Sequence, residues 1–258
     1  MNFRQTTLVA ALALSALPAF AQSAAPASPW SATGNVGVFS DYTFRGISQT
    51  NRKPAIQGGF DIAHSSGFYV GNWNSNIDSE AYSGANIEMD FYGGFKATYG
   101  DFGLDIGALY YYYPGSGNTT AFPGSSKVDN TELYIGGSWG PLTAKYFYAV
   151  SDFFSLPDSK GSQYLDLGFA YDVGSGFGIN AHVGYQKLKG GAKVTEIGST
   201  STTDSITDYK IGATYTVEGF VLGAAYVGTN RDLTGGMAGY TNKNISDGSF
   251  VVSLSKSF

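Results

Sequence analysis

The chain is a series of stretches in which apolar and polar residues alternate, and the breaks between these stretches are in turn short and long. Successive side chains of a β-strand point to opposite faces, so each alternating stretch predicts a strand with one apolar face. We identify twelve such stretches after the amino terminus. They are residues 34–46, 54–64, 68–77, 85–99, 103–113, 130–139, 142–151, 162–173, 177–188, 206–217, 220–230 and 248–258.

The lengths of the breaks indicate how the strands are connected. After every second strand the break is very short, as at Gly140-Pro141 and Glu218-Gly219. A membrane barrel with short periplasmic turns and long extracellular loops produces this alternation. The pattern therefore predicts an all-β fold, a transmembrane antiparallel up-and-down β-barrel of about twelve strands. The longer breaks, which become the extracellular loops, are 47–53, 78–84, 114–129, 152–161, 189–205 and 231–247.

A soluble β-sandwich or barrel is the alternative, and composition argues against it. Charged residues are 14% of the chain, whereas soluble domains carry about 25%. A soluble closed barrel fills its interior with large apolar side chains. Alternate positions of a strand share one face, and we call each such set of positions a parity. Here one parity of each strand carries nearly all of the large apolar side chains, and the other carries Asp, Glu, Asn, Gly and Lys. We expect the apolar parity to face lipid and the polar parity to line a lumen.

The two ends of the chain support export to the outer membrane of a Gram-negative bacterium. Residues 1–21 have the form of a signal peptide, with Arg4, an apolar core and an A-x-A site at Ala19–Ala21. We expect residues 22–33 to be a flexible periplasmic lead-in and 34–258 to be the barrel. The carboxy-terminal Phe258 resembles the ending of outer-membrane barrels, which implies that the barrel-assembly machinery and outer-membrane lipids are partners. Lys256 lies on the apolar parity, from which it can reach the headgroups near the membrane edge.

Residues 40–49 read S-D-Y-T-F-R-G-I-S-Q, and this motif resembles the opening hairpin of the TorF-type porin family of proteobacteria. Four further stretches are similar to that family: 69–76, 88–94, 110–115 and 252–258. The resemblance covers essentially the whole mature chain. It implies an outer-membrane β-barrel that acts as a channel, and it implies little about the solute.

Charged residues on the polar parity are the candidate lining of the pore. In the first predicted strand we expect Arg45 to lie across from Gln57 and Asp41 across from Asp61, with Tyr42 and Phe44 on the lipid side. Eight acids against four bases favour passive diffusion of small cationic solutes. The alternative is a network of paired charges that fills the barrel, because twelve strands fall between filled and wide barrels. The predicted lining is Asp41, Arg45, Asp61, Glu88, Asp90, Lys96, Asp105, Glu132, Lys145, Asp166, Asp208 and Lys210.

Other functions find less support in the sequence. A lipid-acting hydrolase needs a base beside its nucleophile, but His182 falls on the lumenal parity and His64 adjoins a turn. We therefore expect no enzyme, no catalytic residue and no cofactor. Two histidines without cysteine disfavour a metal site, and a net charge of −5 disfavours nucleic acid. Tyr111 and Tyr113 face the lumen, where they could form an aromatic path for a sugar or belong to the general abundance of Tyr.

Overall fold

The computed structural model describes residues 28–117, 126–190, 194–195, 202–233 and 244–258. The predicted signal peptide lies outside the described residues, as do parts of the expected loops 114–129, 189–205 and 231–247. Within the described ranges, no helix has both the length and the apolar character needed to cross a membrane.

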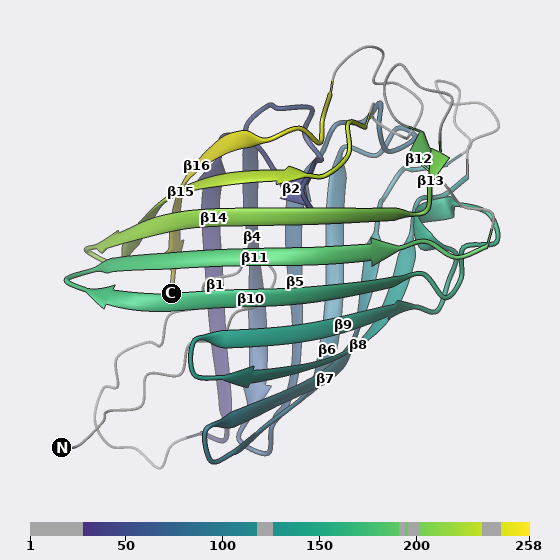
Figure 1. Ribbon diagram of the computed structural model, residues 1–258. Helices are drawn as coiled ribbons and strands as arrows, with labels where there is room; N and C mark the ends of the chain where they lie inside the picture. The colour runs from purple at the N-terminus through teal and green to yellow at the C-terminus, as the bar shows by residue number, and fades with distance from the viewer. Residues whose placement is uncertain (1–27, 118–125, 191–193, 196–201, 234–243) are drawn as a thin grey trace.

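Twelve antiparallel strands form one closed barrel (Figure 1), as the sequence predicts. Each strand pairs with its neighbours in the chain, and the first strand also pairs with the last, which closes the sheet. The barrel strands are β1 (Trp30–Phe39), β4 (Ala55–His64), β5 (Phe68–Asn76), β6 (Ile87–Tyr99), β7 (Phe102–Tyr112), β8 (Asn130–Trp139), β9 (Leu142–Ala149), β10 (Gln163–Gly174), β11 (Phe177–Lys187), β14 (Ser205–Val217), β15 (Phe220–Thr229) and β16 (Ser249–Ser257).

The connections give the barrel two different ends. Short turns join β4 to β5, β6 to β7, β8 to β9, β10 to β11 and β14 to β15, and we call this the turn end. The other connections form the loop end. They include L1 (residues 40–54), L2 (77–86), L4 (150–162) and L6 (230–248), and they carry the short elements β2 (Thr43–Phe44), β3 (Ile47–Ser48), η1 (Phe153–Ser155), β12 (Val194–Thr195) and β13 (Thr202–Thr203).

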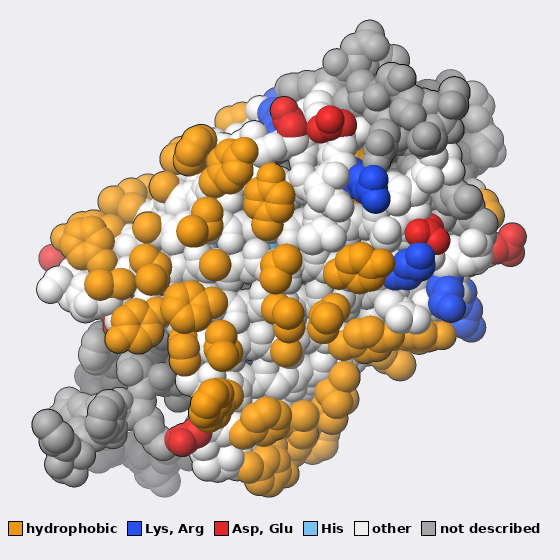
Figure 2. All heavy atoms as spheres, in the orientation of Figure 1, with side chains coloured by type: hydrophobic (Ala, Val, Ile, Leu, Met, Phe, Trp, Pro, Cys, Tyr) orange, Lys and Arg blue, Asp and Glu red, His pale blue; other side chains and the backbone are white. Residues whose placement is uncertain are grey.

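The outer face of the barrel is an apolar belt (Figure 2), in agreement with the predicted lipid-facing parity. Phe60, Phe91 and Ile135 are each about half exposed, and Phe250 is 78% exposed. On a barrel, exposed apolar side chains of this density fit a lipid environment. At the turn end Lys256 lies on this face with its ammonium 4.3 Å from the centre of a Phe ring at the start of β15.

The end of the chain closes the barrel. Phe258 exchanges two backbone hydrogen bonds with Gly34, at 2.8 and 2.9 Å. The Phe258 side chain itself is 74% exposed on the apolar belt. The predicted closing strand is therefore confirmed, and its terminal aromatic stands on the outside of the seam.

The first predicted strand, 34–46, is wrong at both ends. β1 begins at Trp30 and ends at Phe39, and residues 40–54 turn inward as L1. The register differs too, because Gln57 pairs with Gly37 and Asp61 with Thr33 instead of Arg45 and Asp41. The alternation of residues 40–46 resembles a strand, but the chain folds back on itself there, and the Ser48 and Thr50 hydroxyls donate hydrogen bonds to Asp41.

Candidate functional site

A β-hairpin in L1 enters the lumen from the loop end. Its strands β2 and β3 pair only with each other and form a separate two-stranded sheet. Arg45 and Gly46 make the turn, with φ of 48° and 78°. Positive φ at both central residues is the geometry of a type I′ turn, whose twist matches that of the flanking strands. We call residues 42–48 the plug.

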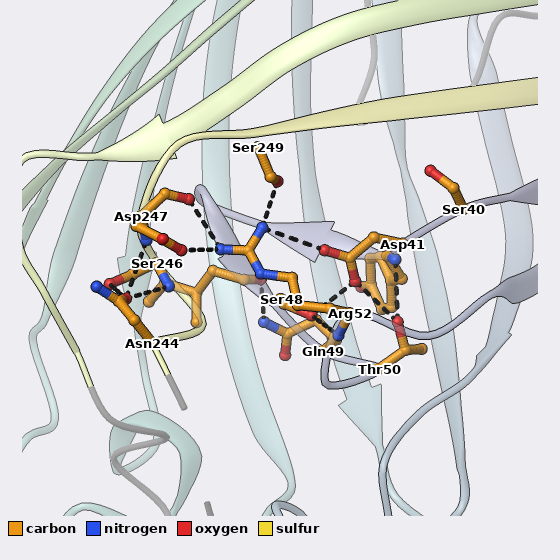
Figure 3. Close-up of polar contacts among 12 residues, drawn as sticks. Ser40, Asp41, Ser48, Gln49, Thr50, Arg52, Asn244, Ser246, Asp247 and Ser249 are labelled. Carbon is orange, nitrogen blue, oxygen red and sulfur yellow. Dashed lines mark hydrogen bonds and ion pairs between the residues drawn. The ribbon is translucent and has the colours of Figure 1, made fainter. Parts of the chain in front are cut away.

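Asp41 holds the base of this hairpin. Its Oδ1 accepts hydrogen bonds from the Ser48 hydroxyl at 2.6 Å and the Thr50 hydroxyl at 2.9 Å. Figure 3 shows the Arg52 guanidinium between Asp41 and Asp247, with N–O distances of 3.5 and 2.6 Å. Arg52 also donates to the Ser249 hydroxyl of β16. L1 is therefore fastened to L6 and to the closing strand at its base.

Arg45 carries the tip of the plug to the opposite wall. Its guanidinium lies 2.7 Å from Glu132 Oε2 on β8 and 2.5 Å from Gln186 Oε1 on β11. The Arg45 Cζ atom also lies 4.0 Å from the centre of the Tyr164 ring on β10. Burial opposes the charged guanidinium, but the combined effect of Glu132, Tyr111 and Tyr164 is larger, so the pKa of Arg45 is raised above its ordinary value. One side chain thus connects the plug to three strands.

Aromatic side chains fill the space around the plug. The Phe44 ring meets Tyr111 of β7 and Phe154 of L4, with ring centres 5.6 and 5.8 Å apart. Tyr42 donates its hydroxyl to Glu88 Oε1 at 3.1 Å and packs edge-on against Trp73 of β5. The sequence interpretation that places Tyr42 and Phe44 towards lipid is therefore wrong. Both are drawn inward because L1 leaves the barrel wall after Phe39.

The Tyr residues predicted to face the lumen are also part of this packing. Tyr111 is 1% exposed and Tyr113 is 3% exposed. Tyr111 donates its hydroxyl to Glu132 Oε2 at 3.1 Å, the same oxygen that Arg45 contacts. An aromatic path for a sugar needs ring faces that a solute can reach, whereas these rings are covered by protein.

The predicted lining residues separate into two layers along the barrel. The plug layer, near the loop end, is buried, with no acid in it more than 8% exposed. The second group, which we call the chamber residues, lies toward the turn end, and its side chains are only partly buried or are exposed. The plug layer contains Asp41, Arg45, Glu88, Asp90, Glu132 and Asp208, and the chamber contains Asp61, Lys96, Asp105, Lys145, Asp166 and Lys210.

Within the chamber, an ion pair joins β9 to β7 across the intervening β8. Lys145 Nζ lies 2.8 Å from Asp105 Oδ2, and the Tyr69 hydroxyl donates to Asp105 Oδ1 at 2.5 Å. Lys96 Nζ is 4.4 Å from the centre of the Tyr69 ring. Lys145 therefore stands beside an opposite charge, and Lys96 stands over the negative face of an aromatic ring.

His182 links the two layers. Its Nδ1 lies 2.9 Å from Asp166 in the chamber, and its Nε2 lies 2.5 Å from Asp208 in the plug layer. An ionised carboxylate only accepts hydrogen bonds, so both contacts together suit a protonated imidazole with two donors. Tyr164, which packs under the Arg45 guanidinium, donates to the same Asp208 at 3.1 Å. A continuous series of contacts through Tyr164, Asp208 and His182 thus joins the plug tip to the chamber.

Two charged residues of this site lie outside the set predicted from the sequence. Arg52 falls in a break between predicted strands, and nothing in the local pattern indicates that it contacts Asp41. His182 has the lumenal parity, but its two partners come from different strands. The other histidine, His64, is at the turn end, with Nδ1 2.7 Å from the Ser66 hydroxyl. In the described part of the chain, no three His, Cys, Asp or Glu side chains form a group able to hold a metal.

The fold is similar to that of solved structures, two of which are named as porins. The chain is similar to the KdgM porin at 7% identity, with a TM-score of 0.51, covering 88% of this chain and 99% of that one. It is similar to the NanC porin at 10% identity, with a TM-score of 0.54 and the same coverage. These likenesses show the fold, a closed β-barrel. No curated protein sequence matches the chain. The profile of a family described as "Bacterial protein of unknown function (Gcw_chp)" matches residues 23–258, and the chain therefore belongs to that family.

Proposed function

We propose that this protein is an outer-membrane channel, of the TorF type that its motifs resemble, for passive diffusion of small solutes. One observation carries the proposal: a closed barrel with an apolar outer belt has partly accessible charged side chains on the opposite face of its strands. In a membrane barrel, a polar interior of this kind accommodates water and solutes. Export by the signal peptide of residues 1–21 and assembly through Phe258 belong to the same proposal.

The cation preference expected from the sequence is proposed to arise in the plug layer. The chamber is balanced, because Asp61, Asp105 and Asp166 face three lysines. In the plug layer five acids face Arg45 and Arg52. A ring of excess carboxylates at a constriction favours cations. Any solute that crosses the barrel has to pass this layer, so its charge sets the selectivity.

A barrel that is closed by its plug and has only a structural role is the second candidate. The packing of Phe44 against Tyr111 and Phe154, together with the buried ion pair of Arg45 and Glu132, favours it. An enzyme that acts on lipid receives no comparable support. His64 and Ser66 are close, but they belong to a tight turn next to β4 and their hydrogen bond stabilises that turn.

Flux into liposomes separates the two candidates. Purified protein is reconstituted into liposomes, and the uptake of alkali cations, chloride and neutral sugars of increasing size is followed. A channel lets small solutes enter faster than they enter protein-free liposomes, with cations ahead of chloride. Uptake equal to that of protein-free liposomes, by protein that is folded in the bilayer, supports the structural role.

A further inference from the structure

We infer that the plug is a movable gate of the channel, latched shut by the contact of Arg45 with Glu132. This inference rests on the proposed function. In this inference the plug opens and closes the channel, and the Arg45 side chain at its tip keeps it closed. The L1 motif that carries the family resemblance, residues 40–49, is then the gating element of the protein.

The hairpin is independent of the hydrogen-bonded wall of the barrel. β2 and β3 pair with each other and with no barrel strand among the described residues. The plug backbone bonds to another loop, where Ser48 N donates to Ile245 O of L6 at 2.8 Å. The plug can therefore lift toward the loop end while the pairing of the twelve barrel strands stays complete.

Side chains at the tip supply the hold on the far wall. Arg45 bonds Glu132 and Gln186 on strands that lie across the lumen from L1, and its guanidinium covers Tyr164. A charge-assisted contact of this kind is stronger than a neutral hydrogen bond. The base of L1 is fastened separately, through Arg52 to Asp247 and Asp41. This division leaves the base as a hinge and the tip as a latch.

The closed arrangement also contains groups that oppose it. Among the described residues, two buried polar atoms around the plug have no hydrogen-bond partner: Asn130 Nδ2 and Glu132 Oε1. A buried polar group without a hydrogen-bond partner destabilises the closed state. A hydrogen bond to water would remove this cost. Lifting the plug admits water to this layer and satisfies these atoms. The latch and the unsatisfied atoms therefore act in opposite directions, which is the condition for a gate that opens and closes.

Reversible cross-linking tests the gate, because the chain contains no cysteine that would react elsewhere. The double variant Arg45→Cys/Glu132→Cys removes the latch and places a thiol on each side of it. A short, reducible bis-methanethiosulfonate reagent then joins plug to wall. The matched control is Asp105→Cys/Lys145→Cys, which replaces the chamber ion pair on β7 and β9 and leaves the plug free. Conductance in planar bilayers is recorded before cross-linking, after it and after reduction.

We expect the unlatched variant to be open at least about tenfold more of the time than wild type, as the loss of a contact that contributes ~1.4 kcal/mol would give. Cross-linking should abolish these openings, and reduction should restore them. The control pair should conduct without a reversible closure. An unlatched variant with wild-type open probability, or one that cross-linking leaves conducting, overturns the gate while the channel stands. Absence of conductance in wild type and in every variant overturns the proposed function together with the gate.

A second variant covers the case in which the double substitution fails to assemble. Glu132→Gln keeps the size of the side chain and removes the charge that Arg45 contacts. We expect a higher open probability than in wild type, while Asp101→Asn, the equivalent change at an exposed acid in the turn between β6 and β7, should leave the open probability unchanged. Equal open probability in Glu132→Gln and wild type contradicts the latch.

Discussion

Arg45 and Glu132 are 87 positions apart in the chain, yet a guanidinium nitrogen of one lies 2.7 Å from a carboxylate oxygen of the other in the interior of the barrel. Arg45 comes from a loop hairpin and Glu132 from the wall. Their side chains are 7% and 1% exposed, so the pair is shielded from water. This contact joins the tip of the hairpin to the barrel wall.

Removal of one partner from this pair should destabilise the protein. Arg45→Ala leaves Glu132 buried without its counter-charge, a change that typically costs about 3–5 kcal/mol. We expect the folded band on a detergent gel to convert to the unfolded form at a lower temperature. Arg45→Lys should restore part of the loss, because an ammonium lacks the planar fork that reaches Glu132 and Gln186 together. A wild-type conversion temperature in Arg45→Ala would show that the pair does not contribute.

The pH dependence of this effect follows from the guanidinium. Because the pKa of Arg45 is raised in the folded protein, its contribution is complete below the unfolded-state value and is lost only at more alkaline pH. The difference in conversion temperature between wild type and Arg45→Ala should therefore stay constant from neutral to moderately alkaline pH. A difference that shrinks over that range would mean that another group carries the contact.

Gly46 should tolerate no side chain. Its φ of 78° is unfavourable for other residues, and a Cβ there would lie 2.6 Å from Gly228 O. Gly100 is the matched control, since it also has a positive φ of 62° but nothing within 4 Å of a Cβ. We expect Gly46→Ala to lower the conversion temperature by more than Gly100→Ala does. The left-handed backbone alone costs about 1–2 kcal/mol in either variant. The additional loss in Gly46→Ala measures the close approach of the new Cβ to Gly228 O. Equal effects would show that the tip is not tightly packed.

Deletion of Phe258 should reduce assembly. The residue closes the seam through its backbone bonds to Gly34 and ends the strand with an exposed ring. We expect less protein in the outer-membrane fraction and more degradation in the periplasm, measured by immunoblot of cell fractions. Normal amounts of the truncated chain in the outer membrane would contradict the proposed role in recognition by the assembly machinery.

Protease added to intact cells tests the orientation. If the loop end faces the exterior, cleavage should fall in residues 114–129, 189–205 or 231–247. The turns at Gly100 and Gly140 should be cut only after the outer membrane is permeabilised. Mass spectrometry of the fragments identifies the sites. Cleavage at the turns in intact cells, with the loops protected, would reverse the assigned sidedness.

Much of the barrel could be predicted from the sequence because strands and turns have local signals. Alternation of parity marks the apolar face of each strand, and residues such as Gly140-Pro141 or Glu218-Gly219 mark the turns between them. The same local signal fails at residues 40–46, which alternate like a strand but belong to a hairpin. The hairpin is held there by hydrogen bonds that the Ser48 and Thr50 hydroxyls donate to the Asp41 carboxylate.

The plug could not be predicted for a related reason. Its turn has Arg45 and Gly46 at positions where Asn-Gly or Asp-Gly is the usual signal. Its contacts with Glu132 and Gln186 are long-range, and Arg52 meets Asp247 across the seam of the barrel. The residue types of the lumen were visible in the sequence. Their division into a buried layer and an accessible chamber follows from where L1 lies.

The most direct test of the channel is a planar-bilayer recording of the purified wild-type protein in a gradient of KCl, with the reversal potential as the measured quantity. We predict discrete openings whose reversal potential is displaced toward the equilibrium potential of potassium, because acids outnumber bases in the plug layer that every ion must cross. A bilayer that contains folded protein and shows no openings would contradict the channel. Openings that reverse at the chloride potential would contradict the assignment of selectivity to the carboxylates of the plug layer.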